Sequence, residues 1–246
     1  MTRTLLFLLF GSILLVGCQP KEVVEKPTNQ PESGGAANPI ESKPEEPPKP
    51  TVSLPANLKH DGLLFFGLDS AKTVSYEVTD DAGDVRTGTQ KSELVEVKDG
   101  KGIYQVTRTG SFGELLGEDQ QVVVTDKGVL ATEIKGQKID PPQMEMPAEL
   151  KPGTTWSVAN KFTLDGRKFE QKNTYKAIKV EQVKTKAGSY ECMLIEIKGS
   201  VSIDGQKMDL QTKAWFSKSI GEVKIEMTTK VGGKDRKFVI EAVSVS

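Results

Sequence analysis

The feature that most constrains the fold is a repeated alternation of apolar and polar residues, broken by Asp-Gly pairs. The segment TVSYEVT at residues 73–79 places Val74, Tyr76 and Val78 on one face of an extended chain. The same alternation recurs in YKAIKVEQV (175–183) and GEVKIEMT (221–228). Asp-Gly pairs at 99–100, 165–166 and 204–205 lie between such segments, and this pair favours the type I′ turn that joins antiparallel strands. The sequence therefore predicts a series of β-hairpins.

The hairpins predict an all-β domain over residues 57–246. We count about ten to twelve strands, and no segment shows a clear apolar stripe at helical spacing. A sheet of this size must curl, close or split into two packed sheets. We expect a large curved antiparallel sheet, as a half-barrel, an open barrel or a sandwich. The stretch DPPQMEMPAELKPGTT (140–155) interrupts the alternation, so two halves of the domain are expected to meet near residues 140–152.

Charge and composition exclude a nucleic-acid partner. Residues 57–246 hold 28 basic and 28 acidic residues, and lysines alternate with acids as on a solvated strand face. The chain has one His and two Trp, and no basic block is interleaved with aromatic residues.

The N-terminus has the form of a secretory signal. An apolar run from Leu5 to Val16 follows Arg3, and its 12 residues fall short of the roughly 20 that a bilayer span needs. The run ends in Leu15-Val16-Gly17-Cys18, which resembles the lipobox of bacterial lipoproteins. The alternative is an ordinary secretory signal followed by an incidental cysteine.

The lipobox resemblance implies a location. Residues 1–17 would be removed as a signal peptide, and Cys18 would carry a diacylglyceryl group on its thiol and an acyl chain of the palmitate type on its new amino group. Two or three acyl chains give stable anchoring where one does not. The expected place is the bacterial cell envelope, on the extracytoplasmic side. The residue after Cys18 is Gln19 rather than Asp, which favours the outer over the inner membrane.

Residues 18–56 are predicted to form a disordered tether. The stretch from Gln19 to Ala56 holds 9 of the chain's 13 prolines and includes KPEEPPKP at residues 43–50. Such a composition cannot bury enough apolar surface to offset the entropy of ordering.

The second half of the domain resembles uncharacterised bacterial secreted and lipoprotein domains. The resemblance lies in ELKPGTTW, in VEQVKTKAGSYECMLIEIKG and in KAWFSKSIGEVKIE. Its matching positions are Leu150, Gly153, Trp156, Ala187, Gly188, Tyr190, Cys192, Trp215, Phe216, Gly221, Val223 and Lys224. The resemblance implies a curved-sheet half-barrel, distantly like periplasmic lipoprotein carriers of the LolA and LppX kind.

No residue pattern points to catalysis, a metal or a cofactor. Cys192 shares a strand face with Tyr190 and Leu194, so we expect it in the core. The only histidine, His60, has no cluster of further metal ligands and no nucleophile motif near it, and is expected at the surface or in a turn. The acidic group in TDDAGD (79–84) lacks the ligand spacing of a calcium loop and fits a turn.

Three aromatic residues, Trp156, Trp215 and Phe216, are the candidates for lining a ligand cavity. Neighbouring residues on a strand point to opposite faces, so Trp215 and Phe216 enter one core only if both faces are covered. The alternative, which we favour, is that one packs in the core and the other under a loop. We expect a non-catalytic interaction or scaffold module with a protein or lipid partner in the envelope. The alternative is a carrier or sensor of an apolar ligand, such as a lipid, in the concave face of the sheet.

Overall fold

Twelve strands and three short helices form the part of the chain that the computed structural model describes, which is residues 53–246 without 70, 118, 165, 219 and 232. The helices are η1 (Ala56–Leu58), α1 (Asp61–Phe65) and α2 (Gly110–Leu116). The strands of the first half are β1 (Thr73–Asp80), β2 (Val85–Lys98), β3 (Lys101–Thr109), β4 (Asp119–Thr125), β5 (Gly128–Ile134) and β6 (Gln137–Pro147). Those of the second half are β7 (Thr155–Leu164), β8 (Arg167–Thr185), β9 (Gly188–Ile203), β10 (Gln206–Ser217), β11 (Gly221–Val231) and β12 (Lys234–Val245).

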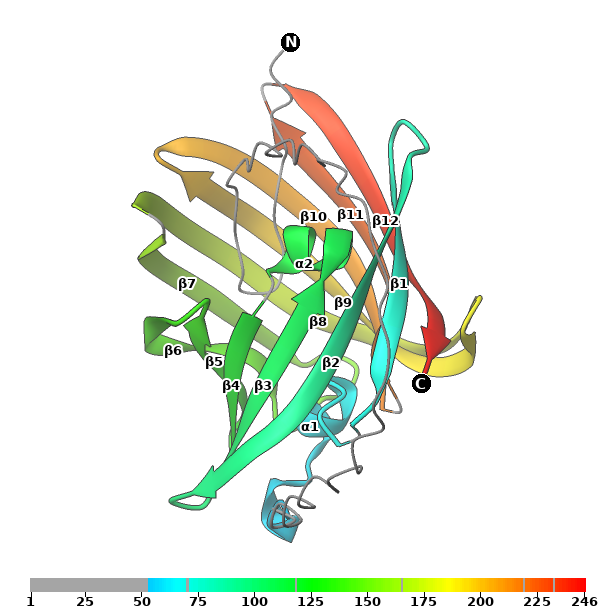
Figure 1. Ribbon diagram of the computed structural model, residues 1–246. Helices are drawn as coiled ribbons and strands as arrows, with labels where there is room; N and C mark the ends of the chain where they lie inside the picture. Colours follow the sequence, from blue (N-terminus) through cyan, green and yellow to red (C-terminus); the bar gives the residue numbers. More distant parts are fainter. Residues whose placement is uncertain (1–52, 70, 118, 165, 219, 232) are drawn as a thin grey trace, which may run out of the picture. The chain divides into compact units, whose positions relative to one another are not determined.

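All twelve strands belong to one antiparallel sheet in the order β6-β5-β4-β3-β2-β1-β12-β11-β10-β9-β8-β7. Strands β1–β6 form one wall, cyan to green in Figure 1, and β7–β12 form the other, yellow-green to red. The walls join where β1 pairs with β12, with Val78 opposite Ile240. At the two free edges, the Asn160 side-chain amide of β7 donates to Gln143 Oε1 of β6 at 2.6 Å. The sheet is therefore a nearly closed barrel, which confirms the all-β prediction.

The Asp-Gly pairs form the turns predicted for them. Asp99 and Gly100 have φ of 51° and 71°, and Asp204 and Gly205 have φ of 50° and 84°, as a type I′ turn requires. Asp165 of the third pair lies outside the described residues. Lys135 and Gly136 adopt the same positive φ between β5 and β6.

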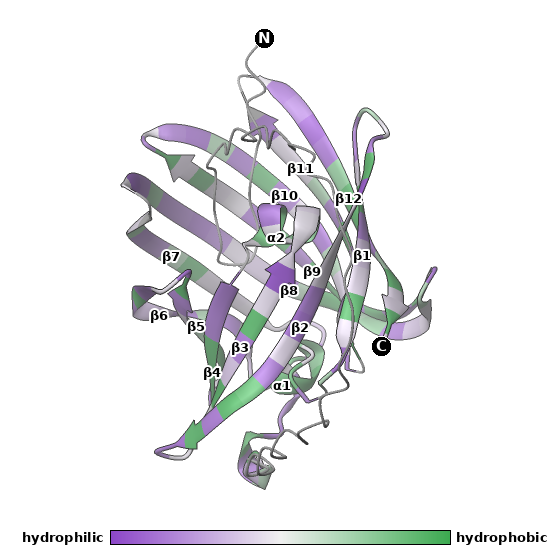
Figure 2. Ribbon diagram, in the orientation of Figure 1, coloured by the Kyte–Doolittle hydropathy of each residue, from purple (hydrophilic) through white to green (hydrophobic). Residues whose placement is uncertain are grey.

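Alternate residues on the strands point into the barrel. Figure 2 shows hydrophobic and hydrophilic residues alternating along them, and Val74, Tyr76 and Val78 are all buried. The main core cluster draws on both walls and on α1 and α2. A smaller cluster gathers near the β5–β6, β7–β8 and β9–β10 turns, and comprises Ala131, Ile134, Ile139, Phe169, Val201, Ile203 and Met208.

Helix α2 fills part of the concave face. Its Phe112 ring stacks on Tyr76 with the ring centroids 4.0 Å apart. The helix lies so close to β2 that a Cβ on Gly88 would collide with Phe112. Both α-helices were absent from the sequence prediction, because five and seven residues are too few to display a helical stripe. Among the described residues, none of the helices has the length and apolar character of a membrane span.

The interruption predicted from residue 140 begins later. Strand β6 runs from Gln137 to Pro147 and includes Pro141 and Pro142, so only residues 148–154 link the walls. An edge strand tolerates proline because no neighbouring strand needs the missing N–H group.

Candidate functional site

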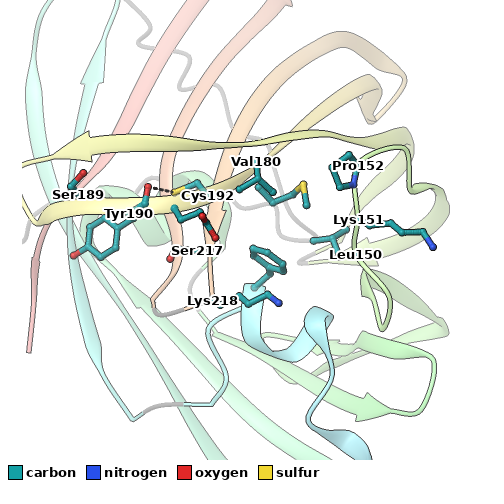
Figure 3. Close-up of a pocket in the computed structure, with 12 residues that line it drawn as sticks. Leu150, Lys151, Pro152, Val180, Ser189, Tyr190, Cys192, Ser217 and Lys218 are labelled. Carbon is teal, nitrogen blue, oxygen red and sulfur yellow. Dashed lines mark hydrogen bonds between the residues drawn. The ribbon is translucent and has the colours of Figure 1, made fainter.

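A pocket of about 440 Å³ lies at the end of the barrel that α1 covers, and is the candidate functional site. Figure 3 shows α1, the β6–β7 loop, the β8–β9 hairpin and the end of β10 converging on it. Its walls are mainly apolar and its rim carries two lysines and a glutamate. The lining consists of Phe65, Leu150, Lys151, Pro152, Val180, Ser189, Tyr190, Glu191, Cys192, Met193, Ser217 and Lys218.

The long β8–β9 hairpin crosses this end of the barrel to form one wall. The N–H group of Ala187, at the tip, donates to the Ala242 carbonyl of β12 at 3.3 Å. The neighbouring Lys186 ammonium lies 2.6 Å from Glu77 Oε2 of β1. These contacts hold the hairpin across the opening, and Val180 remains 46% exposed on the pocket side.

Helix α1 forms the opposite wall and is fixed at its first turn. His60 Nδ1 accepts the Leu63 N–H group at 3.1 Å, which caps the helix, and His60 Nε2 lies 2.9 Å from the Thr125 carbonyl. The second helical residue, Gly62, lies so close to the Pro147 carbonyl that a Cβ could not fit. Lys218 extends over the Phe65 ring, 5.1 Å from its centroid, and reaches Asp61 Oδ1 at 2.6 Å.

The pocket contains a thiol with little nucleophilic character. Cys192 is buried, as its strand position predicts, and its Sγ donates to the Tyr190 carbonyl at 3.5 Å. Burial raises the pKa of Cys192 to about 12, and the nearby carboxylates of Glu181 and Glu191 add to the rise. The thiolate, which is the reactive form, is therefore disfavoured at neutral pH.

A second notable group of side chains lies inside the barrel around Arg108 of β3. Arg108 Nε donates to Gln90 Oε1 at 2.6 Å, and its Nη1 donates to Gln120 Oε1 at 3.1 Å. The Gln120 amide in turn donates to Glu145 Oε1 at 3.0 Å. Glu222 of β11 faces the same group and hydrogen-bonds Gln90. We call these five residues the Arg108 network.

The Arg108 network holds two carboxyl groups against one cation. Burial raises the pKa of Glu145 to about 7, and the Arg108 charge and the Gln120 hydrogen bond only partly oppose the rise. Burial also raises the pKa of Glu222, against the same Arg108 charge. Glu222 Oε2 is buried without a hydrogen-bond partner among the described residues. The arrangement favours one protonated carboxyl group near neutral pH.

Comparison with known proteins assigns the family. A family model described as DUF3108-like matches residues 71–235, which is more than half of the chain. The chain belongs to the DUF3108-like family. A search of curated proteins found no match.

Two solved structures similar to this DUF3108-like chain share its fold, and a third is similar at a lower TM-score. A proposed exported protein with a YmcC-like fold from Bacteroides fragilis is 13% identical, with a TM-score of 0.50, over 74% of this chain and 98% of its own. A proposed lipoprotein from Parabacteroides distasonis is 12% identical, with a TM-score of 0.52 and the same two coverages. The hypothetical lipoprotein YmcC from Escherichia coli K12 is 10% identical over 76% of this chain and 90% of its own, with a TM-score of 0.31.

The three aromatic residues named as candidates for lining a cavity do not line the end pocket. Phe216 is buried inside the barrel, and Trp156 stacks on Tyr175 with centroids 4.9 Å apart. Trp215 is buried in the main core cluster, its Nε1 donates to Glu181 at 2.9 Å, and Lys224 lies over its ring. The β10–β11 register shifts between Trp215 and Phe216, and both neighbours are buried in the same core cluster.

The other candidate residues have structural contacts. Asp80 Oδ1 accepts the N–H groups of Ala82 and Asp84, so TDDAGD forms the expected turn. No group of metal-ligating side chains occurs among the described residues. His60, expected at the surface or in a turn, is half-buried in the short connection between η1 and α1 and caps α1. Cys18 lies outside the described residues.

Sequence reasoning missed both the pocket and the Arg108 network. The signal for Arg108 was present, because it is in phase with the inward-facing Tyr104 and Val106 on β3. The pocket left no local signal, since its residues come from four segments that only the closed sheet brings together.

Proposed function

We propose that this DUF3108-like protein is a membrane-anchored extracytoplasmic lipoprotein whose barrel is a non-catalytic interaction module of the bacterial envelope. The lipobox ending in Cys18 supports the anchor, with Gln19 favouring the outer membrane. Two proteins that share the fold are described as a proposed exported protein and a proposed lipoprotein, which agrees with this location.

The observation that carries the proposal is that the barrel's own side chains fill much of its concave face. Phe112 of α2 stacks on Tyr76, Trp156 stacks on Tyr175, and the Arg108 network lies among the core residues. The apolar end pocket faces outwards instead, and exposes Val180 beside a rim of charged side chains. An apolar anchor of a partner that enters such a pocket, with polar contacts around it, is the usual form of a protein interface.

Site-specific photo-crosslinking in intact envelopes tests this function. A photoreactive residue replaces Val180 in the pocket or, as a matched control, Val95 on β2, which is 57% exposed. We expect a discrete crosslinked protein adduct from position 180 and none from position 95. Equal adduct patterns at both positions, or no adduct at position 180, would contradict an interaction site at the pocket.

One observation favours the alternative function, a carrier of an apolar ligand: the volume of the end pocket. About 440 Å³ falls within the range of small-molecule sites, so an apolar ligand would sit in the end pocket rather than the concave face. Native mass spectrometry of the purified protein distinguishes the two functions. The interaction module predicts the mass of the protein alone. A bound lipid that is lost in Val180→Phe, which fills the pocket, would favour the carrier.

A further inference from the structure

The charges of the barrel are segregated between its two walls. The balanced total hides this, because residues 57–152 hold 11 Lys and Arg against 17 Asp and Glu, while residues 153–246 hold 17 against 11. The sheet order keeps β1–β6 contiguous and β7–β12 contiguous. The wall formed by β1–β6, the acidic wall, therefore has a net negative charge, and the wall formed by β7–β12 has a net positive charge.

The basic excess lies on the outer face of β7–β10. The side chains of Lys161, Lys172 and Lys198 are 75%, 68% and 71% exposed. Small polar residues separate the lysines: in the register, Thr174 lies opposite Lys198 and Ser200 lies opposite Lys172. The carboxylates nearby are fewer, and one of them, Glu170, lies between Lys161 and Lys172 at 3.3 and 3.2 Å.

We propose that the outer face of β7–β10, the basic wall, docks on an anionic lipid surface. The inference rests on the proposed function in one respect: the acyl anchor on Cys18 keeps the barrel close to a bilayer. Charge complementarity favours an anionic lipid surface as the partner, because its negatively charged phosphate groups attract the exposed ammonium groups of the flexible lysine side chains.

The contact takes place at the level of the lipid headgroups. Among the described residues, the exposed large apolar side chains are Val85, Val95 and Val180, and none lies among the lysines at the centre of the basic wall. Attraction without apolar insertion is screened by salt, with a Debye length of about 10 Å at 0.1 M. Each basic residue near an anionic surface strengthens the association about fivefold.

Spin labels on the complete lipoprotein, reconstituted into vesicles, test the docking. One label replaces Gln211, which lies opposite Lys198 on the basic wall, and the other replaces Thr107 on the outer face of β3. Cys192 is buried and stays unlabelled. The vesicles contain either phosphatidylethanolamine with phosphatidylglycerol or phosphatidylcholine alone. Accessibility to a water-soluble and to a lipid-soluble relaxation agent is measured at low and high salt.

We expect the label at 211 to lose accessibility to the water-soluble agent on the anionic vesicles only, and to regain it at high salt. Its accessibility to the lipid-soluble agent should change little, because the contact stays at the headgroups. The label at 107 should be unaffected. Replacing Lys161, Lys172 and Lys198 with Gln should reduce docking about 100-fold at about fivefold per charge. The matched triple change of Lys91, Lys98 and Lys101 on the acidic wall should have little effect.

Several outcomes would overturn the proposal. A label at 211 that responds equally to both vesicle types, or that ignores salt, excludes electrostatic docking. Protection of both labels without vesicles would show that the acidic wall of one copy covers the basic wall of another. Failure of the anchor is seen separately, because the protein would then not float with the vesicles at all.

Discussion

At the scale of single residues, the Arg108 network makes the stability of the barrel depend on pH. Burial places the pKa of Glu145 near 7, above the ordinary 4.5, so the folded state holds this proton more tightly than the unfolded state. Its stabilising contribution is complete below about pH 4.5 and is lost as pH rises through about 7. The surface carboxylates of Glu170 and Glu181 have lowered pKa values, so their contribution to stability is present at neutral pH and is lost as the pH falls.

We predict that the free energy of unfolding falls by a few kcal/mol between about pH 5 and pH 8. Glu145→Gln should flatten this slope, because the amide keeps an oxygen for the Gln120 donor and cannot titrate. Chemical denaturation at the two pH values measures the free energy of unfolding of the variant and of the unmodified protein. The exposed Glu96→Gln on β2 is the control and should keep the slope of the unmodified protein. An unchanged slope in Glu145→Gln would contradict the role given to this carboxyl group.

At the scale of elements, helix α1 depends on its histidine cap. His60→Ala removes the acceptor for the Leu63 N–H group, which should cost about 1 kcal/mol of stability and increase hydrogen exchange in α1. His60→Asn should restore most of the loss, since asparagine is a strong capping residue. Denaturation and amide exchange measure both variants. Equal stability of His60→Ala and the unmodified protein would show that packing alone holds α1 at the pocket.

The edges of the sheet are held together by a partly buried side-chain contact. Asn160→Ala removes the donor to Gln143, which is buried, and should cost about 1–3 kcal/mol and speed amide exchange in β7. Ser157→Ala, on the outer face of the same strand, is the matched control and should cost much less. If the two variants exchange alike, the edges do not depend on the Asn160 contact.

The elements also show how far sequence reasoning extends. Strands and turns were predictable, because period-two alternation and pairs such as Asp99-Gly100 are local signals. The extent of β6 was not, since Pro141 and Pro142 are acceptable only because β6 is an edge strand, and edge position is a property of the whole sheet. The end pocket was unpredictable for the same reason: Phe65 and Val180 meet only once the barrel has formed.

At the scale of the whole molecule, location and charge act together in the proposed account. The sequence that ends at Cys18 resembles a lipobox, and the fold separates 17 basic residues of the second half from 17 acidic residues of the first. An anchored barrel with its basic wall on the bilayer would direct its acidic wall away from the membrane. The outward-facing end pocket would remain available to a partner in the envelope.

Lipidation of Cys18 is the claim on which this account depends most, and metabolic labelling with a clickable fatty acid tests it directly. The account predicts that the mature protein takes up the label, begins at residue 18 and fractionates with membranes. Cys18→Ser should take up no label, and its processed form should leave the membrane fraction. A Cys18→Ser protein that stays with the membranes after removal of residues 1–17, or an unlabelled mature protein, would contradict the account.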